Sequence, residues 1–163
     1  MKTVSINKNM HLSEHFTLGE VTKTSVKTAD GNIPSRVHIE NLKNLCENWL
    51  EELREIYNLI YEGVGDCKGD EPIIITSGYR SPEVNKAVGG SPTSNHLTGC
   101  AVDIRCVGIE QALRYASILL DIADGKKRDF DELLIERNKQ GRYWIHFAVR
   151  PKDNRRKTAF IQA

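Results

Sequence analysis

Two side chains with metal-binding chemistry lie close together in the middle of the sequence. The stretch SNHLTGCAVD, residues 94–103, places His96 and Asp103 seven residues apart around a glycine and small residues. Zn²⁺ accepts both imidazole and carboxylate ligands, and hydrolytic zinc sites use three protein ligands and leave the fourth position for water. A zinc site built on this stretch therefore needs a third protein ligand from elsewhere in the chain.

His146 is the best candidate for that third ligand. It lies in the apolar and aromatic run YWIHFAV near the C-terminus, a composition typical of a β-strand. An imidazole in such a run has no obvious role unless it is paired or ligated. His96, Asp103 and His146 would together hold one zinc ion and leave it an open position.

Length and composition restrict the class of protein. A chain of 163 residues, 39% of them hydrophobic, can bury one ordinary core and is too short for two independent domains. The formal net charge is +1, so no overall field would draw the protein onto nucleic acid or an anionic membrane. The N-terminus lacks the apolar core of a signal peptide, and no stretch reaches the roughly 18 apolar residues of a membrane span. We expect a single soluble domain over residues 1–163 that is made in the cytosol.

The four cysteines, Cys46, Cys67, Cys100 and Cys106, are expected to be free thiols, because no export signal precedes them and their spacings are not those of a metal ribbon. Cys100 and Cys106 flank Asp103 and would be possible metal ligands. They form no C-x-x-C pair, which favours thiols that bind no metal.

The hydrophobic pattern predicts the elements that would position the three ligands. Apolar residues recur at three- and four-residue steps over 35–61, which predicts a long amphipathic helix. A buried strand is predicted at 72–77, and a strand that carries Asp103 at 101–104. A further helix is predicted from 108 to 124, where Gly125 should end it.

The two ends of the chain and a late hairpin complete the prediction. Residues 1–15 form an N-terminal arm, and the chain after it docks by Phe16 and Leu18. Segments 130–136 and 142–149 form a hairpin whose three-residue loop ends at Gly141, where a left-handed backbone is needed. The basic tail, residues 150–163, is expected to be solvated and frayed.

The residues around the first two ligands fill every fixed position of the pattern S-x-H-x-x-G-x-A-x-D, with Ser94, His96, Gly99, Ala101 and Asp103. In this the sequence resembles the zinc D-alanyl-D-alanine carboxypeptidases and endopeptidases that cut bacterial peptidoglycan. The resemblance covers residues 16–149 and is carried by further segments: FTLxE at 16–20, SGYRSP at 77–82, Asn85, GGSP at 89–92, FDEL at 130–133 and WxH at 144–146.

The resemblance implies an α+β fold of the hedgehog/D,D-peptidase type, a small antiparallel sheet with helices packed on it. It assigns the zinc to His96, Asp103 and His146, and it implies that Arg80 binds the substrate's carboxylate. The planar donors of a guanidinium fit that task, although a surface arginine in an exposed salt bridge is the alternative. Ser94 would donate to a ligand or to the substrate, or would only stabilise a turn.

The general base departs from the family pattern. Better-known members carry an acidic residue three positions before the last zinc histidine, where this chain has Tyr143. The predicted hairpin register places Leu134 opposite His146 and Glu136 diagonally beside it, so we predict that Glu136 is the base. A carboxylate that only orients the histidine, or a purely structural one, is the alternative.

We therefore expect a zinc metallopeptidase that hydrolyses an amide bond in peptidoglycan stem peptides, either D-Ala-D-Ala as a carboxypeptidase or L-Ala-D-Glu as an endopeptidase. The resemblance to phage endolysins and prophage enzymes implies synthesis in a bacterial cytoplasm and action on the cell wall. We expect a monomer with the stem peptide as its partner, and with no nucleic acid or membrane. The main alternative is a non-catalytic zinc-containing module that binds cell-wall peptide, which Tyr143 favours.

Overall fold

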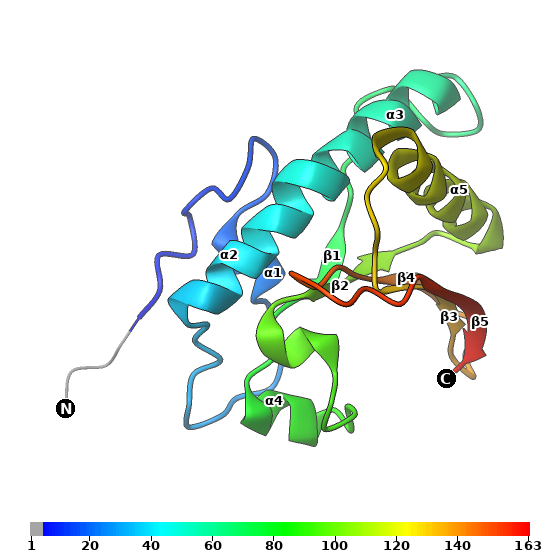
Figure 1. Cartoon of the computed structure of the whole chain (residues 1–163). Coiled ribbons are helices and arrows are strands. Elements are labelled where there is room, and N and C mark those ends of the chain that lie inside the picture. Colours follow the sequence, from blue (N-terminus) through cyan, green and yellow to red (C-terminus); the bar gives the residue numbers. More distant parts are fainter. Residues whose placement is uncertain (1–4) are drawn as a thin grey trace.

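The computed structural model describes residues 5–163, so residues 1–4 of the predicted N-terminal arm lie outside the described residues. A five-stranded sheet in the order β1-β2-β4-β3-β5 carries helices on one face (Figure 1). The elements are α1 (Leu18–Val21), α2 (Arg36–Leu45), a π-helical turn (Cys46–Leu50), α3 (Glu51–Tyr61), β1 (Ile75–Ser77), α4 (Pro82–Ala87), a 3₁₀ turn (Asn95–Thr98), β2 (Ala101–Arg105), α5 (Ile109–Lys126), β3 (Glu132–Arg137), β4 (Tyr143–Ala148) and β5 (Lys157–Gln162).

The predicted helix over 35–61 is one continuous run made of α2, the π-helical turn and α3. Ser35 caps its start by accepting a hydrogen bond from the backbone N–H of His38. The π turn interrupts the regular α-helical hydrogen bonding, but Leu53 and Tyr57 after it stay buried, so the three- and four-residue spacing still describes the buried face. The same spacing predicts Ile60 on this face, but Ile60 is 56% exposed, so the prediction for this residue was wrong.

Two further boundaries differ from the prediction. The buried strand expected at 72–77 pairs only from Ile75, although Ile73 before it is buried. The helix expected to end at Gly125 continues to Lys126, because Lys127 and not the glycine takes the left-handed backbone that ends it, with φ of 53°.

The hairpin is confirmed in its register. The backbone N–H of Asn138 donates to the carbonyl of Arg142 at 3.0 Å, and Gly141 has the left-handed φ of 80°. Leu134 therefore lies opposite His146, and Glu136 opposite Trp144. Since side chains alternate between the two faces of a strand, the helix-covered face takes Ile145 and Phe147, and the open face takes His146.

The basic tail is not frayed, and this prediction was wrong. Its residues 157–162 form β5, which pairs in parallel with β3 at the edge of the sheet, so the sheet is mixed and not purely antiparallel. The guanidinium of Arg156 pairs with Asp124 and Asp129, which gives the tail's charges fixed partners. The α+β class with helices packed on a sheet is confirmed.

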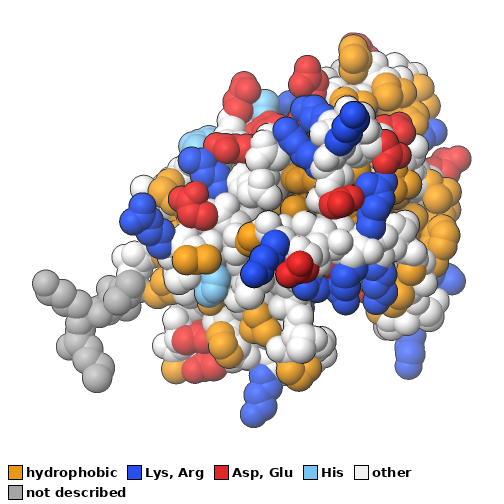
Figure 2. Space-filling view, viewed as in Figure 1, with side chains coloured by type: hydrophobic (Ala, Val, Ile, Leu, Met, Phe, Trp, Pro, Cys, Tyr) orange, Lys and Arg blue, Asp and Glu red, His pale blue; other side chains and the backbone are white. Residues whose placement is uncertain are grey.

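The distribution of surface charge and the state of the cysteines agree with the sequence analysis. Figure 2 shows basic and acidic side chains interspersed over one face, as the formal net charge of +1 suggests. All four cysteines are free and buried. Between residues 5 and 163, no helix combines the length and the apolar character needed to cross a membrane.

Candidate metal centre

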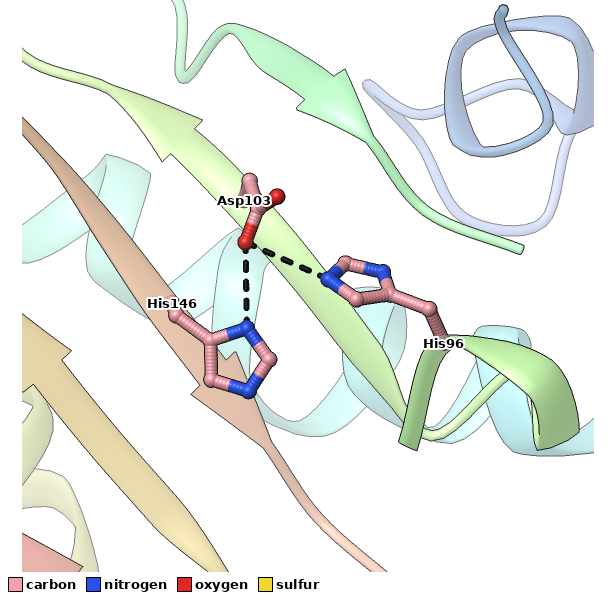
Figure 3. A group of neighbouring side chains, drawn as sticks. All are labelled: His96, Asp103 and His146. Atoms are coloured by element: carbon pink, nitrogen blue, oxygen red, sulfur yellow. Dashed lines mark hydrogen bonds and ion pairs between the residues drawn. The ribbon is translucent and has the colours of Figure 1, made fainter. Parts of the chain in front are cut away.

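Two neighbouring strands and a short turn bring the three predicted ligands together. Asp103 on β2 lies directly opposite His146 on β4 in an antiparallel register. His96 reaches the same point from the 3₁₀ turn that precedes β2, and all three side chains point toward one another (Figure 3). The ligand atoms lie within 4.8 Å of one another, and all three residues are buried.

The spacing of these atoms fits a tetrahedral zinc site. Oδ1 of Asp103 lies 3.3 Å from Nε2 of His96 and 3.1 Å from Nδ1 of His146. Zinc bonds of about 2.0–2.2 Å at tetrahedral angles place neighbouring ligand atoms about 3.4 Å apart. Two imidazoles and one carboxylate are a ligand set that zinc accepts, so the described residues fit one ion with a further position open.

The turn that carries His96 is fixed by the small residues of the motif. The Ser94 hydroxyl caps it by accepting from the backbone N–H of His96, and Gly99 ends it with φ of 71°. A Cβ on Gly99 would lie 2.5 Å from the carbonyl oxygen of His38, so only glycine fits there. Ser94 therefore has the turn-stabilising role that the sequence allowed, while its contact with a ligand or substrate stays a prediction.

The ring of His96 is oriented by the backbone. Its Nδ1 lies 2.6 Å from the carbonyl oxygen of Gly78, which can only accept a hydrogen bond, so Nδ1 carries the proton. Nε2 then keeps its lone pair and faces Asp103. This is the tautomer that a metal ligand requires, with a backbone acceptor on the other nitrogen.

Arg80 lies beside the ligand cluster and is partly buried. Its NH2 donates to Oδ2 of Asp103 at 3.2 Å, and its Nε donates to the Ser77 hydroxyl at 3.0 Å. Its side chain is only 18% exposed, so this is not the exposed surface salt bridge that was the alternative. Burial alone would raise the pKa of Asp103, but His96 and His146 hold it well below its usual range.

Two glutamates from β3 flank His146. Glu136 lies where the register predicted, and its Oε2 accepts a hydrogen bond from the indole Nε1 of Trp144 at 2.5 Å. Burial, followed by the negative charge of Asp103, raises the pKa of Glu136. Oε2 of Glu132 lies 2.9 Å from Nε2 of His146. The sequence reasoning missed Glu132, although the same register places it on the other diagonal of His146.

A cleft of roughly 490 Å³ opens above this part of the sheet. Its lining includes both glutamates, His146, Ser94 and Lys157. Tyr143, three positions before His146, packs against the core. In the better-known members of the family that the sequence resembles, an acidic residue occupies this position. Apart from the ligand Asp103, the acidic groups near His146 are Glu132 and Glu136 on the neighbouring strand β3.

The remaining histidines and the two cysteines near Asp103 lie outside the cluster. His15 pairs with Glu51 at 2.7 Å, and the ring of His38 stacks on Tyr79. Burial raises the pKa of the Cys106 thiol to about 12, so it is protonated at neutral pH. Among the described residues, only one group of three or more histidine, cysteine, aspartate or glutamate side chains is close enough together to hold a metal ion. It consists of His96, Asp103 and His146.

Asp131 is a buried charge next to the site, and it makes stability depend on pH. Burial alone would raise its pKa, but hydrogen bonds from Arg155 and Asn95 hold it well below its usual range. A carboxyl with a depressed folded-state pKa stabilises the protein above its unfolded pKa of about 3.9, and this contribution is lost as pH falls through the folded pKa.

Asp131→Asn should therefore lower the free energy of unfolding by about 3 kcal/mol at pH 7. Urea titrations should show a smaller difference from the wild type at pH 3 than at pH 7. Asp129→Asn is the control, because Asp129 is an exposed partner of Arg156 and should change the free energy of unfolding by about 1 kcal/mol or less. Equal losses for Asp131→Asn at both pH values would contradict this account.

Comparison with protein-family models gives a match over most of the chain. The family model described as Peptidase M15 matches residues 14–146, which is most of the chain and includes all three residues of the cluster. No curated protein matches the sequence.

Proposed function

Because the chain belongs to the peptidase M15 family, we propose that it is a zinc metallopeptidase that hydrolyses an amide bond in peptidoglycan stem peptides. The observation that carries the proposal is the convergence of His96, Asp103 and His146 in one buried cluster, of which His146 also lines the cleft. A zinc ion there would polarise the scissile carbonyl and lower the pKa of a water toward about 7. The roles proposed below for the surrounding side chains rest on their positions and on the family resemblance.

Glu136 is proposed as the general base. It lies in the cleft on the face that carries His146. Its pKa is raised, and a general base works best when its pKa lies close to the pH of the reaction. It would take a proton from the attacking water and pass it to the leaving amine. The indole of Trp144 holds one carboxylate oxygen in place and leaves the other for this proton transfer.

Arg80 is proposed to bind the substrate's carboxylate. Its Nε and NH2 are held by Ser77 and Asp103, which fixes the plane of the guanidinium beside the cluster. A fixed guanidinium is a preorganised carboxylate ligand, and a hydrogen bond to a charged group contributes about 1.5–3 kcal/mol.

Arg80→Lys should therefore lower kcat/KM by about 10–100-fold on a peptide with a free C-terminal carboxylate. The matched substrate is the same peptide with a C-terminal amide, on which wild type and variant should differ much less. Steady-state kinetics on the two peptides measure this difference. Equal losses on both would show that Arg80 acts on Asp103 and not on the substrate.

Digestion of purified peptidoglycan tests the proposed activity. The zinc-loaded protein should release new amines, and mass spectrometry of the products identifies the bond. Free D-alanine indicates a carboxypeptidase, and cleavage between L-alanine and D-glutamate indicates an endopeptidase. His146→Ala is the control for contaminating hydrolases.

The non-catalytic module that binds cell-wall peptide is the second candidate, and the observation behind it is Tyr143. Binding of peptidoglycan without release of any new amine would favour it. The presence of Glu132 and Glu136 beside His146 supports the enzyme instead. The assignment to a phage or prophage lytic enzyme acting on the wall rests on the sequence resemblance.

A further inference from the structure

His146 faces a different carboxylate with each of its ring nitrogens. Nδ1 lies 3.1 Å from Asp103 and Nε2 lies 2.9 Å from Glu132. A metal shared with Asp103 and His96 is reached by Nδ1, which leaves Nε2 to carry the proton. Since an ionised carboxylate only accepts hydrogen bonds, the Nε2–H of His146 would donate to Glu132.

Glu132 is itself held in place on both oxygens. The side-chain amide of Asn95 donates to its Oε2 at 3.2 Å, and NH2 of Arg155 donates to its Oε1 at 3.1 Å. Its side chain is 15% exposed, whereas that of Arg155 is 51% exposed. The carboxylate is therefore fixed between a residue of the metal motif and a residue of the C-terminal segment.

The partners of Glu132 are anchored on Asp131, whose side chain is fully buried. Nε and NH2 of Arg155 bind the two oxygens of Asp131 at 3.0 and 2.8 Å. Asn95 donates to the same carboxylate at 2.7 Å. The backbone N–H of Lys157 donates to the Asp131 carbonyl, which ties the start of β5 to the same point.

From these contacts we propose that Glu132 is a positioning residue that fixes the tautomer and orientation of His146, and that Asn95 and Arg155 hold Glu132 for this task. The inference rests on the proposed zinc site. The segment just before the C-terminal strand β5 thereby supports the metal centre from outside the ligand set. His96 obtains the equivalent support from the backbone carbonyl of Gly78, so each histidine of the cluster has one oxygen acceptor behind it.

Zinc affinity of Glu132 variants, measured by competition with a chromophoric chelator, tests the proposal. Glu132→Ala should weaken zinc binding by about 10–100-fold, as expected when the hydrogen-bond partner of a ligating histidine is removed. Glu132→Gln keeps an acceptor oxygen and should restore affinity to within about threefold of the wild type. Glu136→Gln is the matched control on the same strand and should bind zinc like the wild type.

The other outcomes each overturn the proposal. Wild-type affinity in Glu132→Ala would show that His146 needs no partner. Normal zinc binding in Glu132→Gln with a rate as low as that of Glu136→Gln would make Glu132 a proton-transfer group. A wild-type protein that binds no zinc would overturn the proposed function together with this inference.

Nuclear magnetic resonance of the zinc-loaded wild type tests the same point without a variant, in case Glu132→Ala does not fold. The imidazole nitrogen signals of His146 should show a protonated Nε2 and a metal-bound Nδ1. A proton on Nδ1 would overturn the proposal.

Discussion

Replacing His146 by alanine should abolish zinc retention and peptidase activity together. The change removes one of three protein ligands and leaves Asp103 with only His96 and Arg80 beside it. Two protein ligands do not supply the three-point site on which hydrolytic zinc enzymes depend. Elemental analysis after dialysis, followed by peptidoglycan digestion, measures both effects on one preparation.

The control for this variant is His15→Ala. His15 is a histidine that pairs with Glu51 away from the cluster, so its removal should leave zinc content and rate as in the wild type. An unaltered metal content in His146→Ala would remove His146 from the site.

Glu136→Gln should keep zinc but lower the rate by about two to four orders of magnitude, the range that general acid–base catalysis contributes. The amide keeps the shape of the side chain and an oxygen that can accept from Trp144, so the cleft should be preserved. Loss of the carboxylate leaves no group at this position to take the proton. Steady-state rates at matched zinc occupancy measure the effect.

The control here is Glu55→Gln, an exposed glutamate on α3 that should leave the rate unchanged. Near-normal turnover of Glu136→Gln would rule out the proposed base and direct attention to Glu132 as the proton acceptor.

The local parts of the site could be predicted from the sequence because short-range geometry determines them. The three-residue loop that ends at Gly141 sets the register of β3 and β4, and this register is enough to place Glu136 beside His146. The pairing of Asp103 with His146 joins residues 43 positions apart, which no local pattern fixes. The apolar run around His146 and the family resemblance both suggested that pairing, and the structure brings the two side chains together.

The parts that could not be predicted depend on contacts between distant charges. The tail after Val149 has the composition of a solvated end. In the fold, however, Arg155 pairs with the buried Asp131 and Arg156 pairs with Asp124, just before β5 begins. The ion pair between Arg80 and Asp103 likewise depends on the folded sheet. The hairpin register also places Glu132 diagonal to His146. The hydrogen bond between Glu132 and the imidazole of His146 depends, however, on Asn95 and Arg155, which only the fold brings near Glu132.

Diffraction data collected at the zinc absorption edge from crystals of the zinc-loaded protein would locate the ion relative to the three side chains. We expect one strong anomalous peak about 2.0–2.2 Å from Nε2 of His96, Oδ1 of Asp103 and Nδ1 of His146. Crystals in which the ion lies elsewhere, while these three side chains bind none, would contradict this expectation.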